Sequence, residues 1–162
     1  MKNLKTIAIL LCAIMLFAAL SACGAKVRDD VEISEIGSAI DTAIANTGDL
    51  VSVPESYITG TMKLDVSEYS NYDIKSNSRG VNIDEYGVFK AADSKQAAEI
   101  EAALKKYLQF RIDSWMVEYM PEEFPKMENA EVKVAGNYVM YAILSDENKK
   151  SAFSAFESSI AA

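Results

Sequence analysis

Histidine is absent from the sequence, and cysteine occurs only at Cys12 and Cys23. Without histidine, the chain lacks the most common general base and metal ligand of proteins, so Ser-His-Asp and Cys-His catalytic sites are excluded. A structural zinc site with four Cys or His ligands is not expected either. The segment from Gly80 to Gly87 lacks the glycine spacing and the lysine of a phosphate-binding loop. We therefore expect no cofactor and no bound metal.

Basic residues are scarce, with 16 Lys and Arg against 24 Asp and Glu. Lys2 and Lys5 precede Cys23 and no acidic residue does, so the net charge from Cys23 onward is −10. Nucleic-acid binders need basic patches that displace counterions, so we expect no nucleic-acid partner. The simplest role of this negative charge is to keep the domain in solution.

The first 22 residues have the three-part layout of an export signal. Lys2 and Lys5 form a basic start, residues 7–20 are an unbroken apolar run, and small residues follow. This run is shorter than the roughly 20 apolar residues that a transmembrane helix needs, which argues against a permanent anchor helix. We expect residues 1–22 to be a cleaved signal peptide.

The end of this signal, Leu20-Ser21-Ala22-Cys23, resembles the lipobox of bacterial lipoproteins. The resemblance implies that the Cys23 thiol receives a diacylglyceryl group and that the chain is cut just before it. An ordinary exported protein with a cysteine near its cleavage site is the alternative. Two acyl chains, at about 0.8 kcal/mol per buried CH₂, would hold the protein stably on the extracellular face of the cytoplasmic membrane.

After cleavage the chain keeps only Cys23, so an internal disulfide is impossible and stability must come from packing. We assign residues 23–28 to a lipidated cysteine with a short tether, and residues 29–162 to a single domain. We expect this domain to be monomeric.

The first half of the domain begins with one clear helix. Asp29 or Asp30 is its expected cap, Gly48 its expected end, and its apolar face carries Ile33, Ile36, Ile40 and Ile44. Residues 50–75 are less regular, with short helical turns expected near Glu55 and Val66. A strand from about residue 72, a turn at 77–80 and an extended stretch at 81–90 follow.

The second half has stronger signals. Asp93 and Gln96 form a capping-box-like start to a long helix that we expect to run to Pro121. Its expected core face carries Ala97, Ile100, Leu104, Tyr107, Leu108, Trp115 and Tyr119. A bent segment at 121–127, a strand at 131–135, a turn at 136–137 and a fully apolar central strand at 138–144 follow. Ser145 or Asp146 caps the last helix.

This order predicts an α+β fold: a small, mostly antiparallel sheet of about three to four strands, packed by a long central helix and by N- and C-terminal helices. Several short sequence segments in the second half are also similar to those of a known family. They are residues 87–93 (GVFKAAD), 119–124 (YMPEEF), 129–132 (NAEV) and 136–139 (GNYV). They resemble the bacterial lipoproteins of "domain of unknown function 4358", found mainly in clostridia and related Gram-positive bacteria.

The family resemblance implies the fold order and a cell-surface location, but no activity, ligand or catalytic residue. It also suggests an association with membrane-embedded O-acyltransferases of surface polymers, which provides one alternative function. Paired carboxylates provide another, because two acids in unlike environments can cleave glycosidic bonds. The candidate pairs are Asp84 with Glu85 and Glu122 with Glu123, although adjacent acids are expected on a solvated face.

Two further groups of residues are candidates for ligand binding. Asp65, Glu68, Asn71 and Asp73 lack the ordered spacing of a calcium loop, so a capped turn is the better interpretation. Three tyrosines of the irregular region, Tyr57, Tyr69 and Tyr72, are candidates for a ligand or partner surface. From these observations we expect a non-enzymatic binding or accessory module of the cell envelope, with an integral membrane protein or an envelope polymer as its partner. A carboxylate-dependent hydrolase of wall polymer is the competing class.

Overall fold

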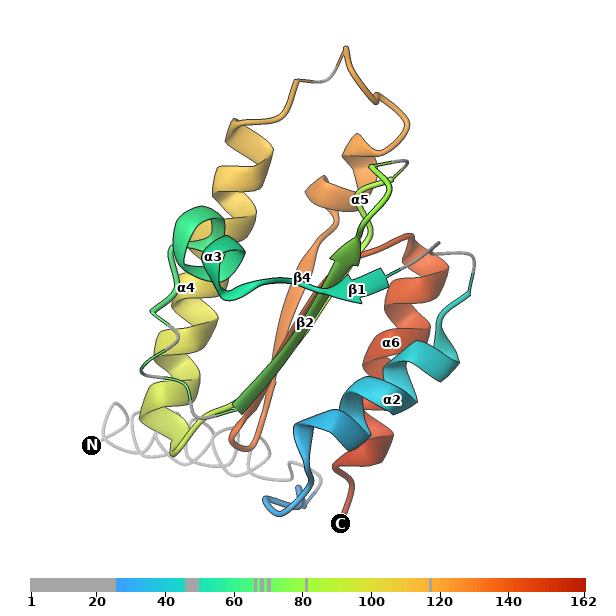
Figure 1. Ribbon diagram of the computed structural model, residues 1–162. Helices are drawn as coiled ribbons and strands as arrows, with labels where there is room; N and C mark the ends of the chain where they lie inside the picture. Colours follow the sequence, from blue (N-terminus) through green and yellow to red (C-terminus); the bar gives the residue numbers. More distant parts are fainter. Residues whose placement is uncertain are drawn as a thin grey trace, which may run out of the picture.

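Figure 1 shows the computed structural model, which describes residues 26–45, 50–65, 67, 69, 71–80, 82–116 and 118–162. Several residues singled out in the sequence lie outside this part of the chain: Leu20, Ser21, Ala22, Cys23, Gly48, Val66 and Glu68. Within it, no helix combines the length and the apolar character needed to cross a bilayer.

Five strands form one antiparallel sheet in the order β1-β2-β3-β5-β4. They are β1 (Leu50–Ser52), β2 (Asn71–Asn77), β3 (Glu85–Lys90), β4 (Glu131–Ala135) and β5 (Tyr138–Ile143). The predicted α+β class and antiparallel sheet are confirmed, with one strand more than expected. The additional strand is β1, which is too short to show an alternating pattern in the sequence.

Successive side chains of β3 and β5 point to opposite faces of the sheet, and both faces are covered. Tyr86 and Val88 of β3 pack on one side, whereas Phe89 packs on the other. Every residue of β5 is buried, as its unbroken apolar run predicted. The sheet therefore separates two hydrophobic cores.

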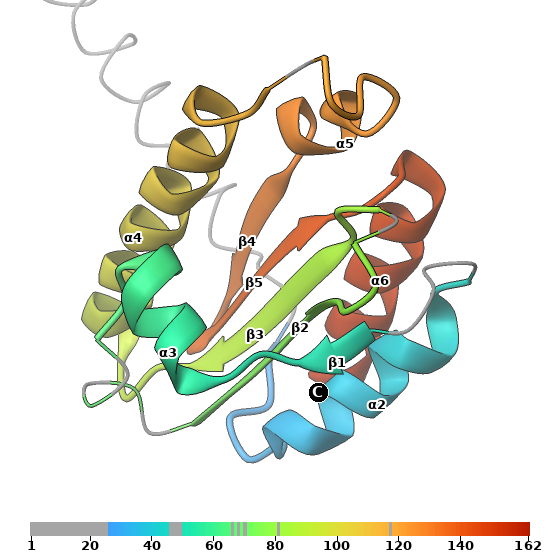
Figure 2. The ribbon, with the colours of Figure 1, turned by 45° about the horizontal axis from the view of Figure 1, so that its top comes forward.

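The helices are divided between these two faces (Figures 1 and 2). Helices α2 (Ile33–Ala43) and α6 (Asp146–Ser159) cover one face. Helix α4 (Ser94–Asp113) covers the other, together with α3 (Glu55–Tyr57) and the π-helical turn η1 (Ile58–Met62). The short helix α5 (Phe124–Glu128) lies between α4 and β4 in the sequence.

The predicted caps of α4 and α6 are confirmed. Asp93 accepts a hydrogen bond from the Gln96 amide at 2.8 Å, and Ser145 accepts one from the Asn148 amide at 3.4 Å. The predicted cap of α2 is wrong, because this helix follows Glu32 and has no side-chain cap. Asp30 instead accepts a hydrogen bond from Arg28, at 3.0 Å.

Helix α4 ends at Asp113, eight residues before Pro121, so the predicted continuation to this proline is wrong. The Ser114 hydroxyl donates to the Phe110 carbonyl at 2.7 Å, a local bond that competes with further helical turns. Tyr119, expected on the core face of the helix, is 73% exposed. Tyr107 is buried as predicted.

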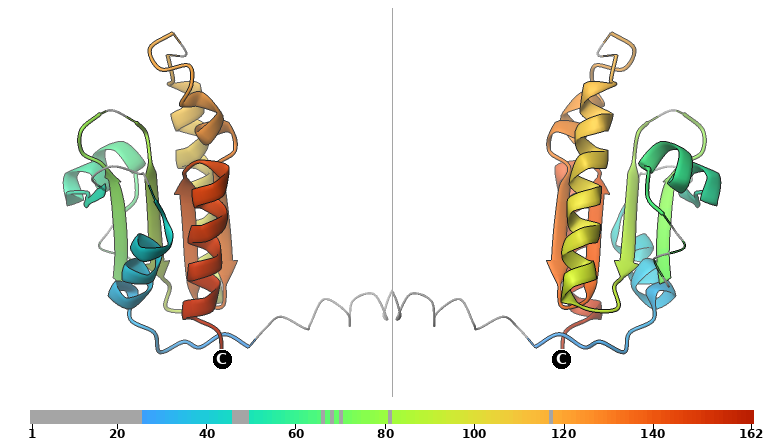
Figure 3. Two further views of the ribbon diagram at one scale, coloured as in Figure 1. Left: turned by 90° about the vertical axis from the view of Figure 1, so that its right-hand side faces the viewer. Right: turned by 90° about the vertical axis from the view of Figure 1, so that its left-hand side faces the viewer.

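The two ends of the described chain are joined by main-chain contacts. Val27 forms a β-bridge with Ala161, the Arg28 amide donates to the Ile160 carbonyl at 2.8 Å, and the Ala162 amide donates to the Lys26 carbonyl at 3.0 Å. Figure 3 shows residues 26–30 and the C-terminus at the same end of the molecule. Residues 26–28, which were expected to belong to the tether, therefore make main-chain contacts with the C-terminal residues of the fold.

Candidate functional site

A surface groove lies between α6 and the edge strand β4. Residues opposite each other in a sheet share a face, so the pairing of Glu131 with Ala142 and of Lys133 with Met140 places both β4 side chains on the α6 side. Helix α6 packs mainly on β5 and α2 and leaves the edge strand β4 largely uncovered on this face. The side chains of Glu131 and Lys133 therefore line an open edge of the sheet. The sheet order thus produces a groove beside α6.

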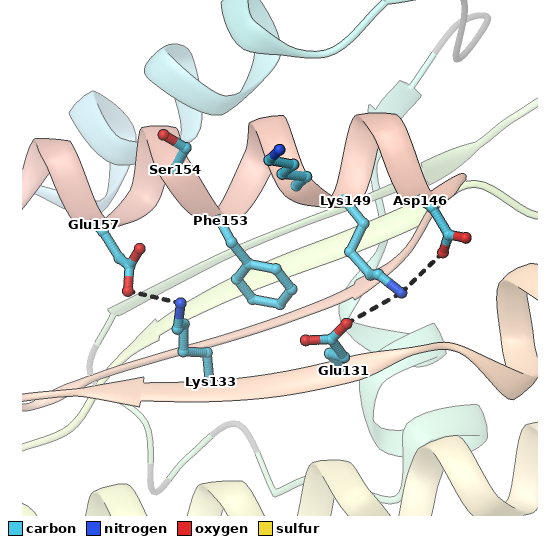
Figure 4. Close-up of a pocket in the computed structure, with 8 residues that line it drawn as sticks. Glu131, Lys133, Asp146, Lys149, Phe153, Ser154 and Glu157 are labelled. Carbon is cyan, nitrogen blue, oxygen red and sulfur yellow. Dashed lines mark hydrogen bonds and ion pairs between the residues drawn. The ribbon is translucent and has the colours of Figure 1, made fainter.

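One half of this groove, which we call the charged pocket, has a volume of about 440 Å³ (Figure 4). It is lined by Glu131, Lys133, Asp146, Lys149, Lys150, Phe153, Ser154 and Glu157. The other half, which we call the apolar pocket, has a volume of about 610 Å³ and is lined by Lys26, Val27, Val134, Ala135, Gly136, Glu157, Ser158, Ile160 and Ala161. Glu157 borders both pockets, so they adjoin along α6.

Two sets of ion pairs span the charged pocket, as Figure 4 shows. The Lys149 ammonium lies 3.1 Å from Glu131 and 3.3 Å from Asp146, and it also donates to the Asn129 carbonyl. The Lys133 ammonium lies 2.6 Å from Glu157 and 5.5 Å from the centre of the Phe153 ring. Positive and negative groups therefore alternate along the pocket, with an aromatic ring between the two sets.

Exposure differs sharply between the partners of the Lys149 pairs. The Lys149 side chain is 9% exposed, whereas Glu131 is 61% and Asp146 is 81% exposed. In the second set, Glu157 is 53% and Lys133 is 42% exposed. The three carboxylates thus lie at the accessible rim, together with the exposed Lys150, and the most buried charge beneath them is the Lys149 ammonium.

The charged pocket was not predicted from the sequence, although α6 carries a signal of it, a lysine on its apolar face. Lys149 lies four residues before Phe153 and seven before Phe156, so a lysine occupies the apolar face of the helix. A charged residue at such a position needs a partner, because an unpaired buried charge is costly. That partner, Glu131, comes from β4, and its location depends on the tertiary fold.

A second polar cluster is buried under α3 and α4. Glu85 is 1% exposed, and one of its oxygens accepts hydrogen bonds from Tyr107 at 2.8 Å and Tyr141 at 2.6 Å. The other oxygen accepts from Tyr57 at 3.0 Å and from Arg111 at 2.9 Å. We refer to these five residues as the Glu85 network.

The surroundings of the Glu85 network keep its tyrosines protonated. Burial, helped by the negative charge of Glu85, raises the pKa of Tyr57 to about 12 and also raises the pKa values of Tyr107 and Tyr141. Burial lowers the pKa of Arg111, but its interactions with Glu85, Tyr107 and Tyr57 together outweigh this effect and the net shift is upward. With both oxygens of Glu85 occupied by donors, the network fits a structural role.

Gly87 makes room for this network. A Cβ atom at this position would lie 2.5 Å from Cε1 of Tyr141 and 3.0 Å from Cγ1 of Ile74. The absence of a side chain therefore allows the Tyr141 ring to cross the strand and reach Glu85.

A solvated face was expected for both acidic pairs named from the sequence, and only Glu122 of the four acids lies on one. Asp84 is 3%, Glu85 1% and Glu123 9% exposed, whereas Glu122 is exposed. Lys126 bridges Asp84 and Glu123 at 2.8 Å each. Burial raises the pKa of Asp84, and the hydrogen bond from Lys126 opposes this shift. The expectation is wrong for the other three acids. Glu85 begins the central strand β3 and Asp84 directly precedes it, whereas Glu123 and Asp84 are paired by Lys126 of α5.

The three candidate tyrosines lie on the α4 side of the sheet, away from the groove. Tyr69 and Tyr72 flank Phe89, with ring centres 5.9 Å and 6.1 Å away, and all three rings belong to the same core cluster. Tyr57 belongs to the Glu85 network. The structure thus brings Tyr69 and Tyr72 together on Phe89 and places Tyr57 in the Glu85 network, and the contact of these tyrosines with a ligand stays a prediction.

Among the described residues, no group of three or more Cys, Asp or Glu side chains is placed to hold a metal ion. Asp65, one of the residues considered for calcium, accepts hydrogen bonds from the amide and the hydroxyl of Ser67 at 3.0 Å and 2.6 Å. The capped turn proposed from the sequence is therefore confirmed at this position.

The fold and the groove define a class of protein: an α+β fold whose antiparallel sheet is covered on both faces, with a charged groove at one edge. Residues 26–144 match the family model described as "Domain of unknown function (DUF4358)", and the chain belongs to this family. The matched range ends just before α6, so the helical wall of the groove lies beyond it. Neither a curated protein nor a solved structure matches the chain significantly.

Proposed function

We propose that this protein is a non-enzymatic binding module of the cell envelope, anchored through a lipid on Cys23 to the outer face of the cytoplasmic membrane. Its binding surface in this proposal is the charged pocket between α6 and β4. The proposed partner is an integral membrane protein or another envelope component that presents positive charge.

The observation that carries this proposal is the uneven exposure of the ion pairs in the charged pocket. Lys149 is 9% exposed and its partners Glu131 and Asp146 are more than half exposed, so these two carboxylates are accessible to an approaching molecule although Lys150 is exposed beside them. A cationic segment can pair with this acidic rim without leaving Lys149 unpaired, since the Asn129 carbonyl also accepts from its ammonium. The net charge of −10 from Cys23 onward attracts the same kind of partner over a longer range.

The competing function, a carboxylate-dependent hydrolase, requires two acids whose environments push their pKa values apart. In the charged pocket the three acids are all more than half exposed and all lie beside a lysine. The buried acids Asp84, Glu85 and Glu123 line neither half of the groove. These arrangements favour recognition over hydrolysis. An accessory role beside a membrane-embedded O-acyltransferase is one form that the recognition function can take.

In-cell cross-linking from the pocket tests the proposed function. A photo-reactive residue at Ser154, exposed within the charged pocket, should form an adduct with a membrane protein. The matched control is the same residue at Ser38, an exposed serine on α2 away from the groove.

Adding Glu157→Lys to the Ser154 variant should abolish the adduct, because it reverses a charge on the rim. An adduct that forms equally from Ser38, or that survives the charge reversal, would show that the pocket is not the binding surface.

A further inference from the structure

The apolar pocket lies at the end of the molecule where the described chain begins. Its wall includes Val27, Ile160 and Ala161, the residues whose main-chain contacts join the two termini. Gly136, in the turn between β4 and β5, forms another part of the wall, and a Cβ atom there would lie 3.0 Å from a methyl of Val27. The pocket is thus built from both chain ends and the β4–β5 turn.

The length of chain between this pocket and Cys23 is short. Lys26 is the third residue after Cys23. A fully extended chain spans at most about 3.6 Å per residue step, or about 11 Å over these three steps. The contacts of Lys26 and Arg28 with the C-terminus fix the near end of this span. The pocket therefore cannot move far from the group that Cys23 carries.

The dimensions of a bilayer show that a span this short brings the apolar pocket to the membrane surface. The acyl chains of a lipidated Cys23 begin at the boundary between hydrocarbon and headgroups, and the headgroup layer of one leaflet is roughly 5–8 Å thick. Lys26 then lies at most a few ångströms beyond the headgroups. In this position an apolar surface is favoured at the interface, and an exposed lysine beside it faces anionic lipid.

From the structure we infer that the apolar pocket is a membrane-docking surface, which contacts the headgroup and acyl boundary of the bilayer that holds Cys23. The inference rests on the proposed lipid anchor and adds an orientation to it. Since the lipid already keeps the pocket beside the bilayer, even a weak contact is populated. Helix α6 then extends away from the membrane, from its end at Ser159 near the bilayer to its start at Asp146 (Figure 3). The charged pocket, which α6 lines from Asp146 to Glu157, lies beyond the apolar pocket along this helix.

Tryptophan quenching by brominated lipids tests this orientation. The lipidated mature protein is reconstituted into vesicles of phosphatidylglycerol and phosphatidylcholine, with or without bromine on the acyl chains. Trp115, the only tryptophan of the chain, is first replaced by phenylalanine. The probe is Ala161→Trp, at an exposed position in the apolar pocket. The control is Met116→Trp, which is 69% exposed just beyond the far end of α4.

Bromine should quench Ala161→Trp several-fold more than Met116→Trp. Lys26→Trp, a second exposed position in the pocket, should behave like Ala161→Trp and covers the case in which that variant misfolds. Equal quenching of pocket and control positions in a protein whose mass shows a lipidated Cys23 would overturn the inference and leave the anchor intact. An unmodified Cys23 would overturn the anchor and the inference together.

Discussion

Replacing Glu85 by glutamine should cost this domain a large part of its stability. The substitution keeps the shape of the side chain but removes the negative charge opposite Arg111, whose side chain is only 17% exposed. The amide of the new side chain also places an N–H donor where Tyr57, Tyr107, Arg111 and Tyr141 already donate, so that N–H group faces donors rather than an acceptor. Breaking a buried ion pair by removing one partner typically costs about 3–5 kcal/mol. Domains of this kind have a free energy of unfolding of about 5–15 kcal/mol in total.

The matched control is Glu157→Gln, which removes the same charge from an ion pair in which Glu157 is 53% and Lys133 is 42% exposed. Solvent screens such a pair, so a loss of at most about 1 kcal/mol is expected. Urea unfolding of a chain that starts at Gly24 measures both values. With an m-value of about 2 kcal/mol per molar urea, a loss of about 4 kcal/mol lowers the midpoint by about 2 M.

The Glu85 network predicts a specific rescue. Combining Glu85→Leu with Arg111→Met removes both charges and should restore part of the stability lost by Glu85→Gln, because an uncompensated charge no longer remains. If Glu85→Gln and Glu157→Gln lowered the unfolding midpoint equally, the structural role assigned to the network would be refuted.

Other perturbations test the rest of the fold. Because the pKa of Tyr57 rises from 10 unfolded to about 12 folded, its contribution to stability should be complete below pH 10 and disappear as the pH rises towards 12, which alkaline unfolding curves measure. Gly87→Ala should lower the free energy of unfolding by about 1–3 kcal/mol through its clash with Tyr141. Gly60→Ala, where no atom lies within 4 Å of the added Cβ, should be nearly neutral by the same assay. Melting should stay cooperative and unchanged by chelator or reductant, and a melting temperature that fell with either would reveal an unrecognised metal or disulfide.

The sequence predicted the elements whose local signals agree with their tertiary environment. The unbroken apolar run of β5 identified a central strand, and Asp93 with Gln96 identified the start of α4. The Gly136 turn between β4 and β5 was equally clear, since its residue at φ +58° has the backbone conformation that glycine favours. These features depend on contacts between residues close in sequence or on simple burial.

The features that the sequence did not predict depend on contacts between residues that are far apart in the sequence. The burial of Glu85 requires Tyr57, Tyr107, Arg111 and Tyr141 from three other elements, and no local pattern reveals such a set. The charged pocket likewise pairs Lys149 of α6 with a residue of β4. The Cys23 lipidation signal is a linear motif, and it remains a prediction because it lies outside the described residues.

The central claim, that Cys23 anchors this domain to a membrane, is tested most directly by the mass of the mature protein extracted from its own membrane fraction. The account predicts an N-terminal peptide that begins at Cys23 and carries a diacylglyceryl group, and a Cys23→Ala variant that stays an unprocessed precursor and takes up no labelled fatty acid. A mature N-terminus at another residue, an unmodified Cys23 thiol, or fatty-acid labelling that persists in the variant would contradict the claim.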